Sequence, residues 1–461
     1  MTETAPQKSE PPWLARALRL ITDVHPGESI SALLLTANVF LLLSAYYVLK
    51  PLREALILAK ESGAEYKSYL SGAIALFLFV LVPAYGKLVD ALPRIKLVIG
   101  VNLAFAAQLL LFYVAIAIPS LKENLGYVFY VWVGVFNVMV VAQFWGYAND
   151  LYEKEQGERL FPMVAIGASV GAAIGSKGAK ILINGLGEPT MLLVAAGLLV
   201  VCAGLYLLVE RREGNPAKQT ADAKSGGDDA KSGGDDAKKK SKKGGFTLVL
   251  GQRYLLLIAL FALIYNWVNS NGEYMLSRVI QEEAAKAIGA GKLAAKDKGS
   301  AIGAAYADFF FYVNVAGVLL QTFVVSRVVR WLKLPTAFLF MPVLALTNGL
   351  LFAFVPFVAK IGKGAENAID YSLNNTLKQM LWLVTSPDMK YKAKQVVDTF
   401  CVRIGDFCSA MSVLVAVDLL KFSVPTFAWI SIVLSGVWVM LAIAIGRLYH
   451  GFEERKEKLG T

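Results

Sequence analysis

The sequence predicts an all-α protein that crosses a membrane twelve times, as two bundles of six transmembrane helices. Of its 461 residues 56% are hydrophobic and only 18% are charged, whereas soluble domains are about 25% charged. The mean hydropathy is +0.53. Apolar runs of about 20 residues recur along the chain, and a helix of that length spans the hydrocarbon core of a bilayer. A polar, lysine-rich stretch divides these runs into two equal sets.

The two sets of runs define the expected order of the chain. The first set is 30–50, 68–89, 97–118, 127–147, 160–182 and 190–209, and the second is 253–272, 303–326, 335–358, 366–384, 395–417 and 425–446. The segment between them repeats AKSGGDD, and because such a composition cannot bury a core we expect a disordered linker. The predicted parts are a cytoplasmic N-terminal segment (1–28), a six-helix bundle (29–210), the linker (211–246), a second six-helix bundle (247–447) and a cytoplasmic tail (448–461).

The net charge of +11 is best explained by the loops between the spans. The linker, the tail and the loops 86–96, 327–333 and 388–394 are basic and share one side of a twelve-span arrangement. Because cytoplasmic loops are enriched in Lys and Arg, we expect an integral protein of a bacterial inner membrane with both termini in the cytoplasm. We therefore expect the protein to contact a lipid bilayer and expect no binding of nucleic acid. The longest loop on the opposite side, 275–302, is expected to form an amphipathic or surface helix.

Chemistry at a metal ion or a nucleophile is not indicated. Cys202, Cys401 and Cys408 lie in apolar stretches without CxxC spacing, and His25 and His450 lie near the two ends of the chain. No nucleophile–base pair can be recognised. We therefore expect no enzyme activity, no metal site and no bound cofactor; the sequence leaves the oligomeric state open.

Six spans, a cytoplasmic linker and six further spans are the layout of the major facilitator architecture, in which two halves pack around a central cavity. Short basic turns follow span two (86–96) and span eight (326–336), at equivalent places in the halves. The first turn is similar to the loop motif of that superfamily, in Gly86, Asp90, Arg94 and Lys96. Its charges would then latch helix ends together; two ordinary positive-inside loops are the alternative.

Ionisable side chains inside a span are costly and are candidates for a functional site. The first group, Lys50, Arg53 and Glu54, lies where span one is expected to end, and its i, i+3, i+4 spacing places it on one helical face. Pro51 is expected to kink or break the helix there. The group would anchor an anionic substrate at the mouth of a cavity, or else form a helix end that reaches lipid headgroups.

A second group lies around the turn between spans four and five. Asn149 and Asp150 close span four, and Asn149 is a candidate hydrogen-bonding group for a polar substrate. Gly167, Gly171 and Gly175 recur every four residues in span five. Glycines at this spacing let two helices approach closely, so we interpret them as packing residues.

Two further groups lie in the second half. Asn269 is part of the polar cluster YNWVNSNGEYM, which either binds a sugar or base or ends the helix at the surface. Lys378 lies in the polar stretch DYSLNNTLKQM of the tenth span. In the eleventh span Arg403 is spaced to pair with Asp406 or Asp398, as part of a ligand site or as a structural ion pair.

Several of these stretches together resemble the nucleotide transporter family of bacterial and plastid ATP/ADP translocases. LREALILAKESGAE is similar to its first-helix segment, FWGYAND and GERLFPMVAIGAS to its FWGFAN and KRFYPLFGIGAN stretches, and YSLNNTLKQMLWLVTSPDMKYKAKQVVDTFCVRIGD to its tenth-helix signature. The resemblance implies a carrier that exchanges nucleotides by alternating access. It implies basic groups at Arg53, Lys378, Arg403 and the lysines of 390–394. Of these, Arg53 and Lys378 would attract phosphate, and Arg403 would hold a charged pair or the ligand.

Arg53 stands where the family has a lysine, so a cation is kept there but a planar guanidinium replaces a point charge. Three further positions depart from the family pattern. Val133 and Asn269 stand where the family has glutamates, and Asp406 stands where it has a lysine. Reversing a lysine in a cavity weakens the binding of a polyanion. The departures therefore bear on substrate specificity and leave the predicted fold unchanged.

The leading hypothesis is exchange of an ATP/ADP-type nucleotide or a related phosphorylated anion. One alternative is a proton-coupled carrier of another organic solute, in which Glu54, Asp150 and Asp406 would titrate. An alternative of another class is a membrane scaffold that transports nothing, recognisable by a sealed cavity and a partner bound to the tail or to 275–302.

Overall fold

The structure, a computed structural model of the whole chain, describes residues 24–25, 27–152, 154–213, 245–382, 384–385 and 389–459. Most of the predicted linker and most of the predicted N-terminal segment lie outside these residues. The described ends of the predicted linker are helical, because α7 continues to Glu213 and α9 begins at Gly245. The side chains of Asp90, Lys390 and residues 452–461 also lie outside the described part.

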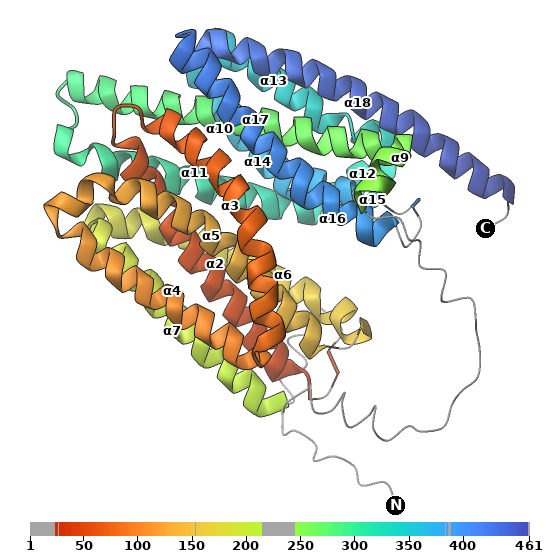
Figure 1. Cartoon of the computed structure of the whole chain (residues 1–461), viewed down its shortest axis with the longest axis horizontal. Helices are drawn as coiled ribbons and strands as arrows, with labels where there is room; N and C mark the ends of the chain where they lie inside the picture. The colour runs from red at the N-terminus through yellow and green to blue at the C-terminus, as the bar shows by residue number, and fades with distance from the viewer. Residues whose placement is uncertain are drawn as a thin grey trace, which may run out of the picture. The chain divides into compact units, whose positions relative to one another are not determined.

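The described residues are almost entirely helical (Figure 1). The helices before the linker are α2 (Ser29–Leu58), α3 (Gly63–Ala91), α4 (Arg94–Ile116), α5 (Pro119–Leu151), α6 (Lys154–Gly185) and α7 (Glu188–Glu213). The long helices after it are α10 (Arg253–Gly289), α11 (Lys298–Phe323), α12 (Val325–Ala337), α13 (Phe340–Phe354), α14 (Pro356–Ile369), α17 (Val402–Val413) and α18 (Val424–Leu459). Short helices α9 (Gly245–Gly251), α15 (Asn375–Met380) and α16 (Lys394–Val396) complete the second part.

Within the described ranges, eleven helical segments are long and apolar enough to cross a membrane. Eleven of the twelve expected spans overlap one of these segments. The tenth expected span, 366–384, corresponds to α14, a π-helical turn (Asp370–Asn374) and α15 in succession. Its first helix has only 14 residues and carries Lys360, Lys363 and Glu366, so it is too short and too charged to be recognised by apolarity.

Two local expectations are not met in full. Of the kink or break expected at Pro51, the break does not occur, because α2 continues through Pro51 to Leu58; helices packed against other helices tolerate an internal proline. The stretch 275–302 is not a separate surface helix either. Its first part continues α10 without interruption to Gly289, and side chains from Met275 to Ala284 are mostly buried. The polar residues of this stretch did not indicate such burial.

The chain separates into two compact units. Unit 1 comprises Met1–Glu54, Leu81–Gly233 and Tyr306–Phe311, and unit 2 comprises Ala55–Val80, Gly234–Ala305 and Tyr312–Thr461. The first part of α3, up to Val80, therefore belongs to the unit that contains most helices of the second half. Residues Tyr306–Phe311 of α11 belong to the unit that contains the helices of the first half. Each unit has its own packed interior.

In unit 1 the glycines of α6 bring that helix directly against α2. A Cβ atom added at Gly167 would lie 2.6 Å from the Thr36 side chain, and one at Gly171 would overlap the Phe40 carbonyl oxygen. The Ser44 hydroxyl of α2 donates a 3.1 Å hydrogen bond to the Gly171 carbonyl oxygen. The packing role expected for the three glycines is confirmed. Helices α4 and α7 of the same unit lie side by side (Figure 1).

In unit 2 the helices α10, α13, α17 and α18 form the packed core. The Phe261 ring stacks on Phe338 with 4.3 Å between centroids, and Trp438 packs edge-on against Phe261 at 5.4 Å. Gly405 of α17 lets that helix approach α10, since an added Cβ would lie 2.6 Å from the Leu263 carbonyl oxygen. Large apolar side chains also remain exposed on both units, such as Leu111 (70%) and Phe354 (70%), as expected of helices that face lipid.

The α2–α6 contact gives a stability prediction. Replacing Gly171 by alanine inserts a methyl group into the Phe40 backbone, and overpacking of this kind costs about 1–3 kcal/mol. Thermal unfolding of the purified protein in detergent should shift down by about 1–3 °C, because the shift per kcal/mol becomes smaller as the chain becomes longer. Gly178→Ala on the same helix is the control, because nothing lies within 4 Å of its added Cβ. Equal melting temperatures for the two variants would contradict the assigned contact.

Candidate functional site

The polar groups of unit 2 are organised around one helix, α10. Its apolar residues pack in the core, while a polar series follows the rest of the helix: Asn266, Asn269, Ser270, Asn271, Glu273, Ser277 and Gln281. These residues contact α14, α17 and the part of unit 2 formed by residues 55–80. A membrane helix does not expose such groups to hydrocarbon, so each must be satisfied by protein, water or a ligand.

A closed ion pair lies where α10 meets α14. The Lys363 ammonium is fully buried and donates 2.8 Å hydrogen bonds to Glu366 Oε1 and to Asn269 Oδ1. The second carboxylate oxygen of Glu366 accepts a 3.0 Å hydrogen bond from the Asn348 amide. Gly272 makes room for the lysine, since an added Cβ would lie 3.1 Å from its Nζ. Both charges are thus paired and hydrogen-bonded, which is the condition for burying them.

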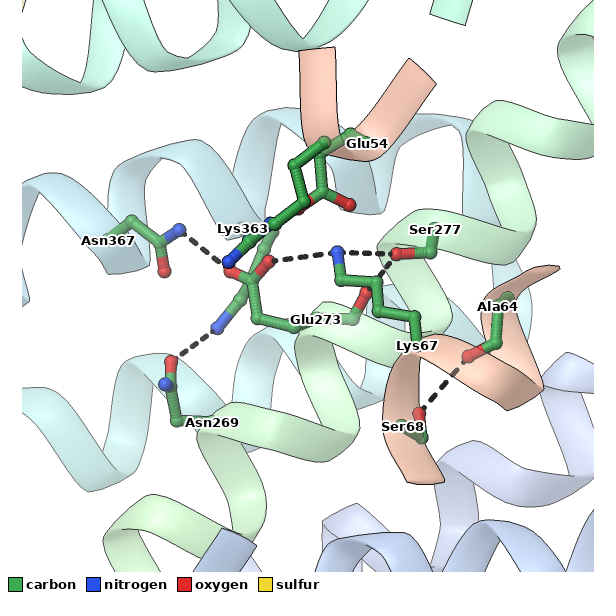
Figure 2. A network of polar contacts seen from close by, with 10 residues as sticks. Glu54, Ala64, Lys67, Ser68, Asn269, Glu273, Ser277, Lys363 and Asn367 are labelled. Carbon is green, nitrogen blue, oxygen red and sulfur yellow. Dashed lines mark hydrogen bonds and ion pairs between the residues drawn. The ribbon is translucent and has the colours of Figure 1, made fainter. Parts of the chain in front are cut away.

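A more open pair lies one helical turn further along α10 (Figure 2). Glu273 Oε1 accepts a 2.9 Å hydrogen bond from the Asn367 amide, and its Oε2 lies 3.9 Å from the Lys67 ammonium. Lys67 is buried and also donates to the Ser277 hydroxyl at 2.9 Å. The Glu273 side chain remains 27% exposed, so the carboxylate can be reached from outside the packed interior.

The segment that carries Lys67 is fixed to α10 by further polar contacts. Glu65 accepts a 3.0 Å hydrogen bond from the Tyr274 hydroxyl and lies 3.4 Å from Arg278. The Gln281 amide donates to the carbonyl oxygens of Leu58 and Lys60 at 2.8 and 2.9 Å. The first turns of α3 are thereby held in register with the polar series.

On α17 the predicted partners Arg403 and Asp406 do form an ion pair, with 3.1 Å between Nη1 and Oδ2. Asp406 Oδ1 accepts hydrogen bonds from Asn266 at 2.6 Å and Ser270 at 2.8 Å. The sequence offered Asp398 and Asp406 as partners of Arg403, and the ion pair at 3.1 Å is formed with Asp406. Arg403 remains 29% exposed, so its guanidinium has donors left for a ligand.

The fourth polar group lies at the π-helical turn between α14 and α15. Asp370 accepts hydrogen bonds from the Tyr265 hydroxyl at 2.6 Å and from Asn374 at 2.7 Å. Lys378 lies 3.5 Å from Asp370 and 4.3 Å from the centre of the Tyr265 ring. It is 30% exposed. Further π-helical turns occur at Met389–Ala393, Val397–Cys401 and Leu414–Leu419, and such turns are frequent at functional sites.

In unit 1 the three candidates of α2 lie together as expected from their spacing. Arg53 pairs with the buried carboxylate of Glu54 at 2.6 Å, and its guanidinium lies over the Tyr130 ring at 4.4 Å. The Lys50 ammonium lies 3.8 Å from the centre of the Phe310 ring and 5.3 Å from that of Tyr47. Aromatic faces stabilise cations in this arrangement without neutralising them.

Asn149 has a different setting. It is exposed near the end of α5 and lines an open pocket of about 770 Å³ with Trp145, Tyr152, Glu158 and Phe161. Asp150 beside it forms a 3.0 Å ion pair with Arg94, which is a link between helix ends of the kind expected for the 86–96 turn.

Several polar residues of the site were missed by the sequence analysis: Lys67, Lys363 and Glu366. Glu273 and Asp370 lie in the two polar stretches that the sequence analysis identified, but no individual role was expected for them. Lys363 and Glu366 have the i, i+3 spacing of an ion pair, and this signal was obscured because the tenth span was expected to begin at 366. Lys67 lies two residues after the Gly-Ala-Glu stretch at the start of a span. Lysines are common at the ends of membrane helices, so the sequence gave no reason to select this one.

The three departures from the family pattern are all built into the packing. Val133 is fully buried among apolar side chains of unit 1. Asn269 binds Lys363, and Asp406 binds Arg403. The Asn269 amide cannot neutralise a lysine, whereas the Asp406 carboxylate neutralises an arginine.

Comparison with known proteins identifies the class. The family model described as Major Facilitator Superfamily matches residues 30–283, more than half of the chain. The chain belongs to this superfamily and is an integral membrane protein. Solved structures with the same fold include the nucleoside transporter NupG (12% identity, TM-score 0.59, 91% of this chain and 99% of that one) and the peptide transporter PepTSo (10% identity, TM-score 0.60, 92% and 98%).

Curated relatives narrow the comparison. The chain is 22% identical over 369 residues to proteins named ADP,ATP carrier protein 1 from Chlamydia muridarum and Chlamydia trachomatis. The match covers 70% of this chain and 64% of the first and 65% of the second relative. The chain therefore spans about two thirds of the length of these carriers.

The closed pair on α14 gives a second stability prediction. Lys363→Met leaves the buried Glu366 carboxylate without its ammonium partner, and breaking a buried pair costs about 3–5 kcal/mol. Lys360→Met is the control, because the Lys360–Glu283 pair is one third exposed and exposed pairs contribute at most about 1 kcal/mol. Unfolding in detergent should begin at a clearly lower temperature for the first variant only. Similar losses in both would show that Lys363 is not buried as described.

Proposed function

We propose that this protein carries a phosphorylated anion, of the ADP/ATP nucleotide type, across the membrane. The observation that supports this most is the set of cations held inside membrane helices with part of each side chain still accessible: Arg53, Lys378 and Arg403. Intramembrane charges of this kind border pathways for polar solutes. The similarity to curated ADP,ATP carriers supports the same cargo class.

The proposed roles follow from the chemistry of each side chain. Arg403 and Arg53 present planar guanidinium groups, which can bind phosphate oxygens through two parallel hydrogen bonds. Lys378, set between Asp370 and the Tyr265 ring, supplies a single mobile charge. Asn269 and Asn149 supply hydrogen bonds for the neutral part of the cargo, while Lys50, Glu54 and Asp406 set the local charge. Transport would proceed by alternating access, the mechanism of this architecture.

We also infer the setting of the protein in the cell. The basic turns that carry Arg94 and Arg327 lie on the same side of the expected span order as the linker and the tail. By the positive-inside rule this side is cytoplasmic. We place both termini there, in a bacterial inner membrane.

Uptake into proteoliposomes tests the cargo. Labelled ATP, ADP and adenosine would be offered to vesicles that contain either no nucleotide or ADP. Uptake of the phosphorylated compounds, with none of adenosine, is expected because the cations recognise phosphate. Uptake of adenosine alone, or accumulation driven only by a pH gradient, would replace the proposal with a carrier of a neutral or proton-coupled solute. Absence of all uptake by folded protein would favour a scaffold.

Lys378 gives a residue-level prediction. Lys378→Gln should lower ADP uptake about tenfold or more, because losing a charge–phosphate contact costs at least about 1.4 kcal/mol. Lys286→Gln, an exposed lysine near the end of α10, should leave uptake within about twofold, since an exposed charge is solvated by water. Undiminished ADP uptake by Lys378→Gln would remove this lysine from the site.

A further inference from the structure

A pocket opens on the surface of unit 2 where the end of α12 meets α18. Its volume is about 420 Å³, which lies within the range of pockets that take small molecules. Thr336 and Leu339 line one side of it, and Ile443, Arg447 and His450 line the other. The pocket therefore combines apolar side chains with a cation and a hydroxyl group.

The two helices that form the pocket are in direct contact beside it. A Cβ atom added at Gly446 of α18 would lie 3.2 Å from the Pro335 side chain of α12. The glycine therefore lets α12 approach α18 at the level of Arg447. This packing brings Thr336 and Arg447 to the same opening, although 110 residues of sequence separate them.

The pocket lies at the level where the lipid headgroups are expected. Span twelve is expected to end at 446, so Arg447 is the first residue beyond it. On the other side of the pocket α11 ends at Phe323, and α12 follows it as the basic turn of 326–336. We place this turn on the cytoplasmic side of the membrane.

Helix α12 has the composition of a helix that lies in a membrane interface. Its buried residues Val325, Leu334 and Ala337 belong to the apolar core of unit 2. Elsewhere on the helix Arg330 is exposed and the Trp331 side chain is 74% exposed. Amphipathic helices that carry basic residues and tryptophan bind at the boundary between headgroups and acyl chains.

The arginine of the pocket differs from the arginines of the cargo site. Arg53 and Arg403 are each paired with a carboxylate, at 2.6 and 3.1 Å. The exposed guanidinium of Arg447 forms no hydrogen bond or ion pair with any residue that the structure describes. All its donors are therefore available to an anion, and a guanidinium binds phosphate oxygens through two parallel hydrogen bonds.

We propose that this pocket binds the headgroup of an anionic phospholipid from the cytoplasmic leaflet, with the lipid phosphate on Arg447. The Thr336 hydroxyl hydrogen-bonds the polar headgroup, while Leu339 and Ile443 contact the lipid glycerol and the first methylene groups. Basic pockets between membrane helices on the cytoplasmic side bind anionic lipid in this way. The lining residues are separate from the proposed cargo site, so the inference goes beyond the proposed function.

The charge of the pocket sets the preference among lipids. Phosphatidylcholine carries a trimethylammonium group beside its phosphate, which Arg447 and the exposed Arg330 repel. Phosphatidylglycerol carries a neutral glycerol there, keeps a net negative charge and offers hydroxyl groups to Thr336. The pocket should therefore select phosphatidylglycerol over phosphatidylcholine.

Lipid binding to the purified protein in detergent tests the inference. Native mass spectrometry would give the dissociation constant of the tightest phosphatidylglycerol molecule. Arg447→Gln should weaken this binding about tenfold or more, because the hydrogen bonds of a charged donor to phosphate are lost. Thr336→Trp should weaken it by a similar factor, since the indole fills the pocket while the charge stays unchanged. This second variant also keeps the test available if Arg447→Gln does not fold.

Arg211→Gln is the matched control. Arg211 lies in the last turn of α7, is exposed, and likewise has no hydrogen bond or ion pair with a described residue. Its loss changes the net charge by the same amount but removes no contact to the bound lipid. Binding of phosphatidylglycerol should stay within about twofold of the wild-type value, because water and salt screen a distant charge.

Four results would overturn the inference. Equal weakening by Arg447→Gln and Arg211→Gln would show a diffuse attraction to positive charge. Wild-type binding by folded Thr336→Trp would show that the lipid lies elsewhere, and equally tight binding of phosphatidylcholine would remove the selectivity. Displacement of phosphatidylglycerol by glycerol 3-phosphate of equal affinity would assign the pocket to a soluble phosphate ester. The expected result is a rise in melting temperature with phosphatidylglycerol that is lost in Arg447→Gln and Thr336→Trp and kept in Arg211→Gln.

Discussion

Every polar feature of this protein depends on one constraint, that a charged side chain inside a membrane helix must be paired or must meet water or a ligand. In unit 2 the constraint is met along a single helix, α10, whose amides and carboxylate meet lysines of α14 and of the α3 segment. Gly272 and Gly405 show how closely the backbone is fitted to these groups. Packing and polar contacts are therefore two aspects of the same arrangement.

The pairs differ in how completely they are closed, and this difference suggests a division of roles. Lys363 and Glu366 are sealed in the interior and satisfied by Asn269 and Asn348, so their contribution is structural. Arg403, Lys378 and Glu273 keep between a quarter and a third of their side chains exposed. Groups that combine a fixed partner with remaining access are the ones suited to an exchangeable ligand.

The sequence predicted the class, the order of the spans and several of the charged groups, because these depend on local composition and helical spacing. The i, i+3 pair of Arg403 with Asp406 and the glycine packing of α6 are examples. It could not predict that Lys67 meets Ser277, 210 residues away, because such contacts depend on tertiary packing. Part of the charged helix α14 was expected to be a loop, and the extension of α10 was expected to be an amphipathic or surface helix. In both segments polar residues were taken as a sign of exposure, whereas many of these polar side chains are buried and bind other protein groups.

The central claim is that the polar face of α10 borders a water-filled path for an anion. Thiol accessibility tests it most directly: Ser270→Cys, in a background without Cys202, Cys401 and Cys408, would be treated with a membrane-impermeant, negatively charged thiosulfonate. The account predicts modification of this thiol and its protection by ADP, with no modification of Leu319→Cys, whose side chain is half exposed on the apolar surface of α11. A Ser270→Cys thiol that stays unmodified in folded protein, from either side of the membrane, would contradict the account.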